Sequence, residues 1–282
     1  MRRVISQLNA YIALTRPVNC VITFFVVIVS AIICFSELNS EYIVILAAVS
    51  AALTAAAGNI INDIYDVEAD KINHPERPIA KGMISIKNAW IAYLLLTVVA
   101  ILTSVFINRV ATVIIVLTSI LLYLYSIRIK KIPLLGNVTI AYLTGLAFVY
   151  GGVVVGNVND AFIPAIFAFM INLIRELLKD VEDIEGDKKV GLTTFPIKFG
   201  TKITFMFIVL LTIALILVTI YPFLNQIYSI EYFIITMIIV NPILVYFIKL
   251  LYKDNEQKNL NKLSNMLKLN MVFGLLAIFV GK

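Results

Sequence analysis

The feature that most constrains this chain is a series of nine long apolar runs, which take up most of its 282 residues. Each run is close to the roughly 20 residues that an α-helix needs to cross the hydrocarbon core of a bilayer. A transmembrane β-strand would be half as long and would alternate polar with apolar residues, so the runs predict helices. The expected spans are 17–36, 41–64, 86–106, 110–128, 134–156, 161–184, 203–223, 230–252 and 264–280.

Composition excludes the soluble classes of protein. The chain is 61% hydrophobic and only 14% charged, whereas about 25% of the residues in ordinary globular domains are charged. A water-soluble protein of this size would need more polar side chains to cover its surface. We therefore expect an all-α polytopic membrane protein, with nine transmembrane helices in one bundle and residues 1–282 forming a single membrane-embedded domain.

The net charge of +6 reflects membrane topology more than a nucleic-acid partner, and no nucleic acid is expected. Of the 23 Lys and Arg residues, 21 lie at the N-terminus or in alternate connections between the expected spans. Only Arg109 and Lys282 lie on the opposite side. The positive-inside rule then places the N-terminus and the basic connections in the cytoplasm and the C-terminus outside the cell membrane.

Acidic residues gather in two segments, 58–78 and 175–187, which hold 11 of the 17 Asp and Glu residues. Each segment follows an apolar run, and carboxylates at such depth are functional-site candidates because burying them is costly. Both segments carry aspartates spaced i, i+3 and i+7, and the two sets are offset by a constant 117 residues: Asp63, Asp66, Asp70 and Asp180, Asp183, Asp187.

This constant offset predicts an internal repeat, with a first unit of about 17–128, a second of about 134–252, and the ninth helix, 264–280, outside it. On a continuous helix the spacing places each aspartate set on one stripe. Asn59 extends the first stripe deeper, and Glu176 and Asn172 extend the second. We expect the two stripes to face each other in an aspartate-rich cavity on the cytoplasmic side.

Six converging carboxylates need neutralisation. Oxygen-only ligands suit a hard divalent cation such as Mg²⁺, which often bridges protein carboxylates to substrate phosphates. The pattern therefore predicts a diphosphate and its metal ions held between the two motifs. The remaining phosphate charge would be met by basic residues in the adjoining segments, namely Lys71, Arg77, Lys130, Lys131, Lys179 and Lys188.

These motifs resemble those of the UbiA-type intramembrane prenyltransferases over the whole chain. The resemblance rests on Asn62-Asp63-x-x-Asp66-x-x-x-Asp70, on Arg77-Pro78, on the second aspartate motif, and on the flanking segments Arg16-Pro17-x-Asn19 and Tyr125-Ser126-x-x-x-Lys130. It implies that the aspartates hold Mg²⁺ on a polyprenyl diphosphate, whose C–O bond ionises to an allylic cation that a second substrate traps. All six aspartates are then candidate metal ligands.

The resemblance also assigns roles to the candidate residues. Asp63, Asp66, Asp180 and Asp183 would be catalytic. Substrate contacts would come from eight side chains, namely Asn19, Asn59, Arg77, Lys130, Lys131, Glu176, Lys179 and Lys188.

Within the family, residues 62–78 and 175–187 look most like the archaeal branch that transfers a geranylgeranyl group from geranylgeranyl diphosphate to geranylgeranylglyceryl phosphate. That reaction forms the second ether bond of archaeal membrane lipid. Ubiquinone-type members usually begin the second motif with Asp-Thr-x-Tyr-Ala, where this chain has Arg175-Glu176-Leu-Leu-Lys179. The alternative enzyme is a quinone-pathway prenyltransferase that alkylates an aromatic acceptor such as 4-hydroxybenzoate.

A transporter whose carboxylates carry cations is an alternative from another class. Transporter sites lie near the bilayer midplane, whereas these motifs lie at the ends of the expected spans. Three other features carry structural expectations. Gly151-Gly152-x-x-x-Gly156 predicts a close helix contact, Asn241-Pro242 predicts a kink in the eighth span, and residues 253–268 read as a solvated connection.

Overall fold

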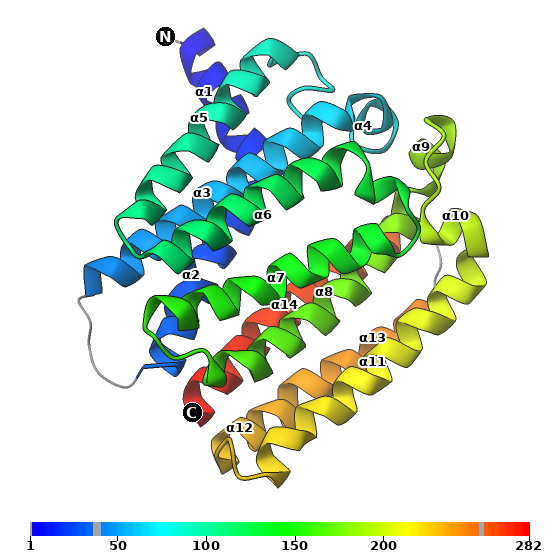
Figure 1. Cartoon of the computed structure of the whole chain (residues 1–282). Coiled ribbons are helices and arrows are strands. Elements are labelled where there is room, and N and C mark those ends of the chain that lie inside the picture. The colour runs from blue at the N-terminus through cyan, green and yellow to red at the C-terminus, as the bar shows by residue number, and fades with distance from the viewer. Residues whose placement is uncertain (1, 36–40, 254–256) are drawn as a thin grey trace.

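The computed structural model describes residues 2–35, 41–253 and 257–282, and all regular structure in these ranges is helical. The predicted all-α class is therefore confirmed. The helices run roughly alongside one another in a bundle (Figure 1). They are α1 (Arg2–Thr15), α2 (Pro17–Ile33), α3 (Glu41–Tyr65), α4 (Val67–Asn73), α5 (Ile86–Val105), α6 (Arg109–Ile127), α7 (Leu135–Val154), α8 (Phe162–Glu182), α9 (Ile184–Lys189), α10 (Phe195–Phe199), α11 (Thr201–Leu224), α12 (Ile230–Ile235), α13 (Asn241–Lys253) and α14 (Gln257–Gly281).

Eight helical segments within the described ranges are long and apolar enough to cross a membrane. The first expected span, 17–36, corresponds to α2, which has only 17 residues. It reaches spanning length together with Gln7–Thr15 of α1, across a bend of 47°. Arg16 lies at this bend in a left-handed conformation (φ 53°), and Pro17 begins the next helix. The chain is a multi-pass membrane protein, and its nine-span count remains a prediction.

The interpretation of residues 253–268 as a solvated connection was wrong over 257–268, which already belong to α14. Leu260, Leu263 and Leu267 recur at helical spacing and are buried in the hydrophobic core. Packing of this apolar stripe against the core stabilises the helix. The polar residues between the leucines lower the average hydropathy of the segment, but they lie on other faces of the helix.

The two halves of the chain occupy neighbouring parts of the bundle (Figure 1). In the first half, α3 packs against α2, α5 and α6; in the second, α8 packs against α7 and α11. The last helix, α14, packs against α8, α12 and α13. The main core cluster lies in the second half and joins α7, α8, α11, α13 and α14.

The close contact predicted for Gly151-Gly152-x-x-x-Gly156 is confirmed at Gly151 but is wrong at Gly156, which lies beyond the end of α7 and has open space beside it. A Cβ atom on Gly151 would lie 2.8 Å from the carbonyl oxygen of Val27 on α2. At the same crossing, the hydroxyl of Ser30 donates a hydrogen bond of 2.5 Å to the carbonyl oxygen of Phe148. The absence of a side chain at Gly151 therefore lets α2 and α7 approach closely.

The predicted irregularity at Asn241-Pro242 is also found. A five-residue π-helical turn, Thr236–Val240, joins α12 to α13 directly before Asn241-Pro242. Proline lacks an N–H group and its ring displaces the carbonyl four residues earlier, which accounts for the irregular turn.

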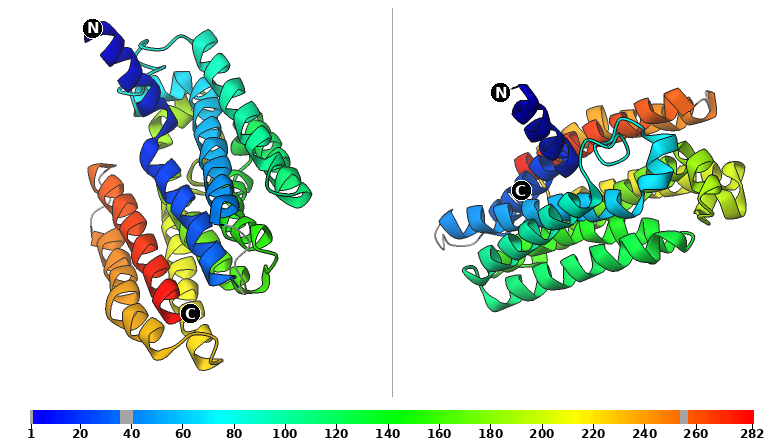
Figure 2. Two further views of the ribbon diagram at one scale, coloured as in Figure 1. Left: turned by 90° about the vertical axis from the view of Figure 1, so that its left-hand side faces the viewer. Right: turned by 90° about the horizontal axis from the view of Figure 1, so that it is seen from above.

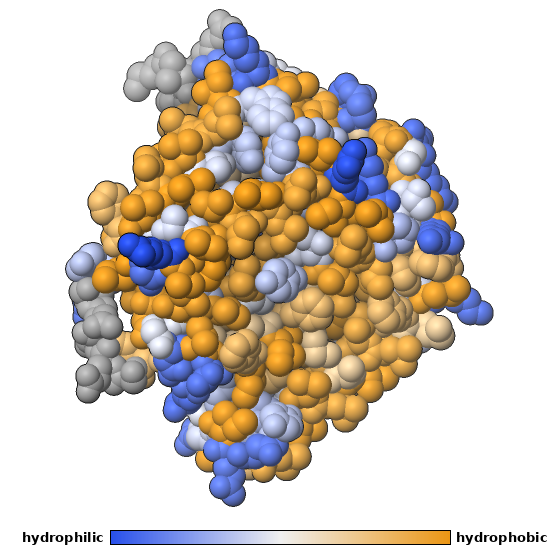
Figure 3. All heavy atoms as spheres, in the orientation of Figure 1, coloured by the Kyte–Doolittle hydropathy of each residue, from blue (hydrophilic) through white to orange (hydrophobic). Residues whose placement is uncertain are grey.

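The outer surface carries the apolar side chains expected of a protein in lipid. On α5, for example, Leu95 is 63% exposed, and on α11 Leu217 is 63% exposed. Figure 3 shows one face as a broad hydrophobic area, with hydrophilic residues concentrated towards its ends. Side chains of this kind would be unfavourable in water over so large an area.

Candidate active site

Both aspartate motifs lie where a long helix ends and a short one begins. The helix α3 ends at Tyr65 and α4 begins at Val67, so Asp66 occupies the break. In the same way Asp183 separates α8 from α9. The backbone angles match, with φ −99° and ψ 5° at Asp66 and φ −91° and ψ 3° at Asp183. The expectation of two continuous helical stripes was therefore wrong, because each helix is interrupted at its middle aspartate.

The two breaks lie side by side at one end of the bundle, which we call the aspartate end (residues 62–78 and 180–192) (Figure 1). Hydrogen bonds of the Asn73 side chain link the first motif to the second. Its amide nitrogen donates to the carbonyl oxygen of Asp183 at 2.9 Å, and its amide oxygen accepts from the backbone N–H of Gly186 at 3.0 Å. A Cβ atom on Gly186 would lie 2.4 Å from the Asn73 amide nitrogen, so only glycine fits beside this side chain.

Three cationic side chains pair with the first motif. Arg16 pairs with Asp63, Lys130 pairs with Asp66, and Arg77 pairs with Asp70. The Arg77 guanidinium also lies 3.6 Å from Asp63. Asp63 and Asp70 are buried, and burial raises the pKa of Asp70 in spite of the nearby Arg77. These pairings explain how buried carboxylates are tolerated in this state.

The second motif is paired differently. The ring nitrogen Nε2 of His74 donates to the Asp183 carboxylate at 2.9 Å, and the Asn137 amide donates to Asp180 at 2.8 Å. Burial alone would raise the pKa of Asp183, but the His74 hydrogen bond and the Lys179 charge lower it. For Asp187, burial and the charges of Asp183 and Asp66 raise the pKa to about 7. Burial is the largest of these effects, and the charges of Lys179 and Lys130 oppose it.

The described residues include no group of three or more His, Cys, Asp or Glu side chains already arranged to hold a metal ion. The chemistry of the donors nevertheless suits a hard divalent cation, because both motifs offer carboxylate oxygens. Burial is the main cause of the raised pKa of Asp187, but the charge of Asp66 also contributes, so the two motifs approach each other. In this structure the carboxylates of the first motif are paired with protein cations, namely Arg16, Arg77 and Lys130.

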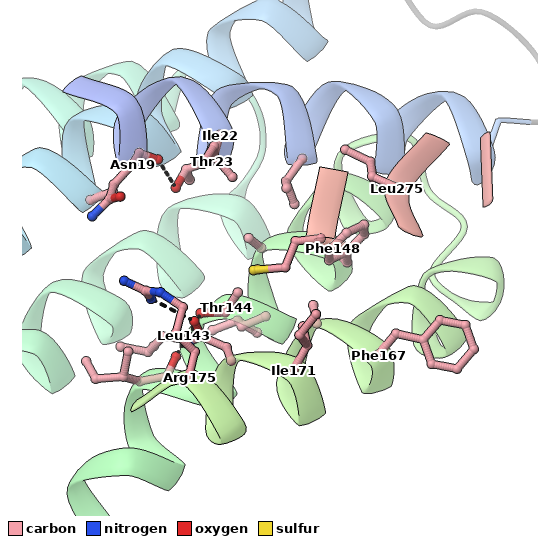
Figure 4. A pocket seen from close by; sticks show the side chains of 18 of the residues that line it. Asn19, Ile22, Thr23, Leu143, Thr144, Phe148, Phe167, Ile171, Arg175 and Leu275 are labelled. Atoms are coloured by element: carbon pink, nitrogen blue, oxygen red, sulfur yellow. Dashed lines mark hydrogen bonds between the residues drawn. The ribbon is translucent and has the colours of Figure 1, made fainter. Parts of the chain in front are cut away.

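A cavity of about 350 Å³ opens between the two halves of the bundle. Its walls come from α2, α3, α6, α7, α8, α11, α14 and the π-helical turn, and most of its lining is apolar. Figure 4 shows Asn19, Ile22 and Thr23 on one wall and Thr144, Ile171 and Arg175 on the opposite wall. Such a cavity suits a long hydrocarbon chain.

None of the six aspartates lines this cavity, so the expected aspartate-rich cavity remains a prediction; the polar part of the lining lies directly beside the aspartates in sequence. On α3, Asn59 and Asn62 line it, directly before Asp63; on α8, Glu176 and Lys179 occupy the positions 117 residues later. Glu176 is buried and accepts a hydrogen bond from Arg175 at 3.2 Å, and the Asn59 amide donates to the carbonyl oxygen of Thr15 at 2.9 Å.

The structure brings most of the predicted residues together, with three exceptions; one of them, Lys71, is exposed and pairs with Glu68 at 2.7 Å. The six aspartates, Arg77 and Lys130 lie at the aspartate end, and Asn19, Asn59, Glu176 and Lys179 line the cavity. Lys131 and Lys188 instead lie on the exposed surface. Their substrate contacts remain predictions that this arrangement does not favour.

Several site residues were not assigned a role from the sequence. Arg16, His74 and Asn137 contact the aspartates directly, and Arg175 and Lys268 line the cavity. Arg16 and Arg175 lie within segments that the sequence analysis compared with the family, so their positions alone could have identified them as candidate site residues. Lys268 had no such signal, because residues 253–268 were interpreted as a solvated connection.

Comparisons with known proteins agree with this geometry. A model of the UbiA prenyltransferase family matches residues 22–272. The chain belongs to the UbiA prenyltransferase family. It is a membrane prenyltransferase, as its curated relatives are. It is 37% identical over 274 residues to the digeranylgeranylglyceryl phosphate synthase of Methanosphaera stadtmanae, a match that covers 97% of this chain and 99% of that protein.

Two solved structures of the family are similar throughout. A digeranylgeranylglyceryl phosphate synthase structure is 34% identical, with a TM-score of 0.73 over 98% of each chain. A UbiA homologue from Archaeoglobus fulgidus, bound to GPP and Mg²⁺, is 23% identical, with a TM-score of 0.67 over 95% of this chain and 99% of that one. The second likeness establishes the fold alone.

Proposed function

We propose that this prenyltransferase moves a geranylgeranyl group from geranylgeranyl diphosphate to the free hydroxyl of geranylgeranylglyceryl phosphate. The observation that carries the proposal is that the two aspartate motifs lie side by side and that the residues directly before Asp63 and Asp180, Asn62 and Lys179, line a large apolar cavity. The relatives named digeranylgeranylglyceryl phosphate synthase support the choice of substrates. The C–O bond to the diphosphate breaks, the ether bond forms, and the hydroxyl proton is released.

In this proposal the carboxylates of Asp63, Asp66, Asp180 and Asp183 are catalytic and hold Mg²⁺, with Asp70 and Asp187 as further ligands. Bound Mg²⁺ would supply Lewis-acid stabilisation of the departing diphosphate. The Mg²⁺ reported with the Archaeoglobus fulgidus homologue supports this choice of metal.

Side chains of the chain itself orient the donor. Lys130 and Arg77, which pair with Asp66 and Asp70, are placed to exchange those carboxylates for phosphate oxygens once a metal neutralises the aspartates. The apolar cavity receives the prenyl tail and excludes water from the allylic carbon. A dry site protects a carbocation from hydrolysis and strengthens the electrostatic interactions around it.

We also propose that the aspartate end faces the cytoplasm and that the chain is one domain built from two repeats. The lopsided distribution of Lys and Arg supports the orientation. The matching helix breaks at Asp66 and Asp183 support the repeat, with about 17–128 and 134–252 as its units. Labelling of single cysteines placed at Lys188 and Asn225 in intact cells tests the orientation; labelling of position 188 from outside would contradict it.

An acceptor competition tests the function. Purified protein in vesicles receives radiolabelled geranylgeranyl diphosphate, Mg²⁺, and equal amounts of geranylgeranylglyceryl phosphate and 4-hydroxybenzoate. We expect label in the diether phosphate. An Asp63→Asn variant should be inactive, whereas Glu231→Gln, which alters an exposed carboxylate outside the aspartate end, should match the unmodified protein. Label in the aromatic acid alone would reject the proposed acceptor in favour of the quinone-pathway alternative.

A further inference from the structure

A second cavity, of about 320 Å³, lies beside the first at the aspartate end. It opens between the start of α2, at Pro17 and Val18, and the first half of α14, at Asn261 and Asn265. Figure 2 shows α2 and α14 on the same side of the bundle. Arg16, Asn19, Arg175, Lys179 and Lys268 line both cavities, so the two are continuous.

The lining of this second cavity is strongly cationic. None of the six aspartates lines it, and Glu182 is its one carboxylate among the described residues. The basic side chains in its wall come from the α1–α2 junction, the segment after α4, and helices α8 and α14: Arg16, His74, Arg77, Arg175, Lys179 and Lys268. A cavity with this charge is built for an anion.

The aspartates do not use all of this positive charge. Arg16, Arg77 and His74 pair with Asp63, Asp70 and Asp183. Within the part of the chain that the structure describes, however, neither Lys179 nor Lys268 forms an ion pair.

Arg175 also retains unused hydrogen-bonding capacity. It contacts Asn172 and Glu176 through Nη1, at 3.2 Å in each case, while its buried Nε has no hydrogen-bond partner among the described residues. Leaving a buried charged donor unpaired is costly, so Arg175 has donor capacity that the described protein groups do not satisfy.

We propose that this second cavity, between Arg175 and Lys268, binds the phosphomonoester headgroup of the lipid acceptor. The inference rests on the proposed function and deepens it, because it gives the acceptor's phosphate a site separate from the donor's diphosphate. A phosphomonoester carries a charge of about −1.5 to −2 and three acceptor oxygens. Arginine offers such a group a planar fork of donors and lysine a compact charge.

The location suits a lipid. Val18 on α2 is 65% exposed and Leu269 on α14 is 53% exposed, so apolar side chains that can face the bilayer flank the cavity. An amphiphile whose headgroup sits between Arg175 and Lys268 can therefore leave its tail in the surrounding lipid. Its glycerol hydroxyl would then reach towards the first cavity, where Asn19 and Lys179 form part of both linings.

The test compares Lys268→Met with a matched control, Lys262→Met, which removes an exposed lysine from the same helix. Lys268→Arg keeps the charge. Initial rates are measured with geranylgeranylglyceryl phosphate and with its dephosphorylated alcohol, and the KM for the diphosphate donor is measured separately. Binding of the phosphorylated acceptor without donor is followed by calorimetry, which needs no turnover.

We expect Lys268→Met to raise the KM and the Kd for the phosphorylated acceptor by about tenfold, the effect of losing one charge-assisted hydrogen bond. The KM for the donor and the rate with the alcohol should change less than about twofold, and Lys268→Arg and Lys262→Met should resemble the unmodified protein. A raised donor KM, or equal effects on both acceptors, would overturn the inference. If the unmodified protein binds the phosphorylated acceptor in a Lys268-dependent manner but transfers nothing to it, the proposed function fails and this site stands.

Discussion

The hydrogen bonds of Asn73 give a quantitative prediction about how the two aspartate motifs are held together. This one side chain bridges the carbonyl of Asp183 and the N–H of Gly186, across more than 100 residues of sequence. At roughly 1 kcal/mol for each net hydrogen bond, Asn73→Ala should weaken the link by about 2 kcal/mol. If turnover requires the linked arrangement, kcat/KM should fall by up to about thirtyfold.

Gly186→Ala probes the same link from its other side. The added Cβ would lie within 2.5 Å of the Asn73 amide, so the side chain must leave its position and the activity loss should be similar. In the double variant nothing remains for the methyl group to displace, and alanine suits a helix better than glycine. The activity of Asn73→Ala/Gly186→Ala should therefore match that of Asn73→Ala alone.

The assay is transfer from geranylgeranyl diphosphate to geranylgeranylglyceryl phosphate under kcat/KM conditions, arranged as a double-mutant cycle. Asn88→Ala, at an exposed position at the start of α5, serves as the control and should not alter the rate. Additive losses in the double variant would show that Asn73 and Gly186 act independently and would refute this reasoning. A full rate in Asn73→Ala would show that the link does not contribute to catalysis.

Three further predictions concern the chemistry. Asn substitutions of the four catalytic candidates, Asp63, Asp66, Asp180 and Asp183, should each lower kcat by at least about 100-fold, since each removes charge stabilisation from the leaving diphosphate; a normal rate in folded protein, checked by gel filtration, would remove that residue from the site. Chelation of divalent ions should stop transfer, and added Mg²⁺ should restore it; turnover in excess chelator would contradict the metal-dependent mechanism. Fluorine beside the reacting carbon of the donor should slow transfer by orders of magnitude, since a glycerol hydroxyl is a weak nucleophile and the cation must form first; a nearly normal rate would indicate that bond formation leads.

The sequence predicted the helical class because long apolar runs have few alternatives in a membrane. The constant offset between Asp66 and Asp183 also predicted that the two motifs are equivalent, and their matching backbone angles agree with this. The helix breaks themselves could not be predicted, because Ile64 to Ala69 contains neither Gly nor Pro.

The cationic partners were harder to predict than the aspartates. Asp63 pairs with Arg16, 47 residues away, and the packing of α1 and α2 against α3 decides that contact. Lys268 was missed for another reason, since the low hydropathy of residues 257–268 obscured the Leu260, Leu263 and Leu267 stripe that keeps them helical. Tertiary contacts of this kind leave little trace in local sequence patterns.

The central claim is that both halves of the chain build one diphosphate site. Its most direct test is equilibrium binding of geranylgeranyl thiolodiphosphate, an analogue that resists ionisation, to the unmodified protein and to Asp66→Asn and Asp183→Asn. We predict binding that requires Mg²⁺ and weakens by more than about tenfold in either variant. Tight binding without Mg²⁺, or binding that one of the two variants leaves unchanged, would contradict this claim.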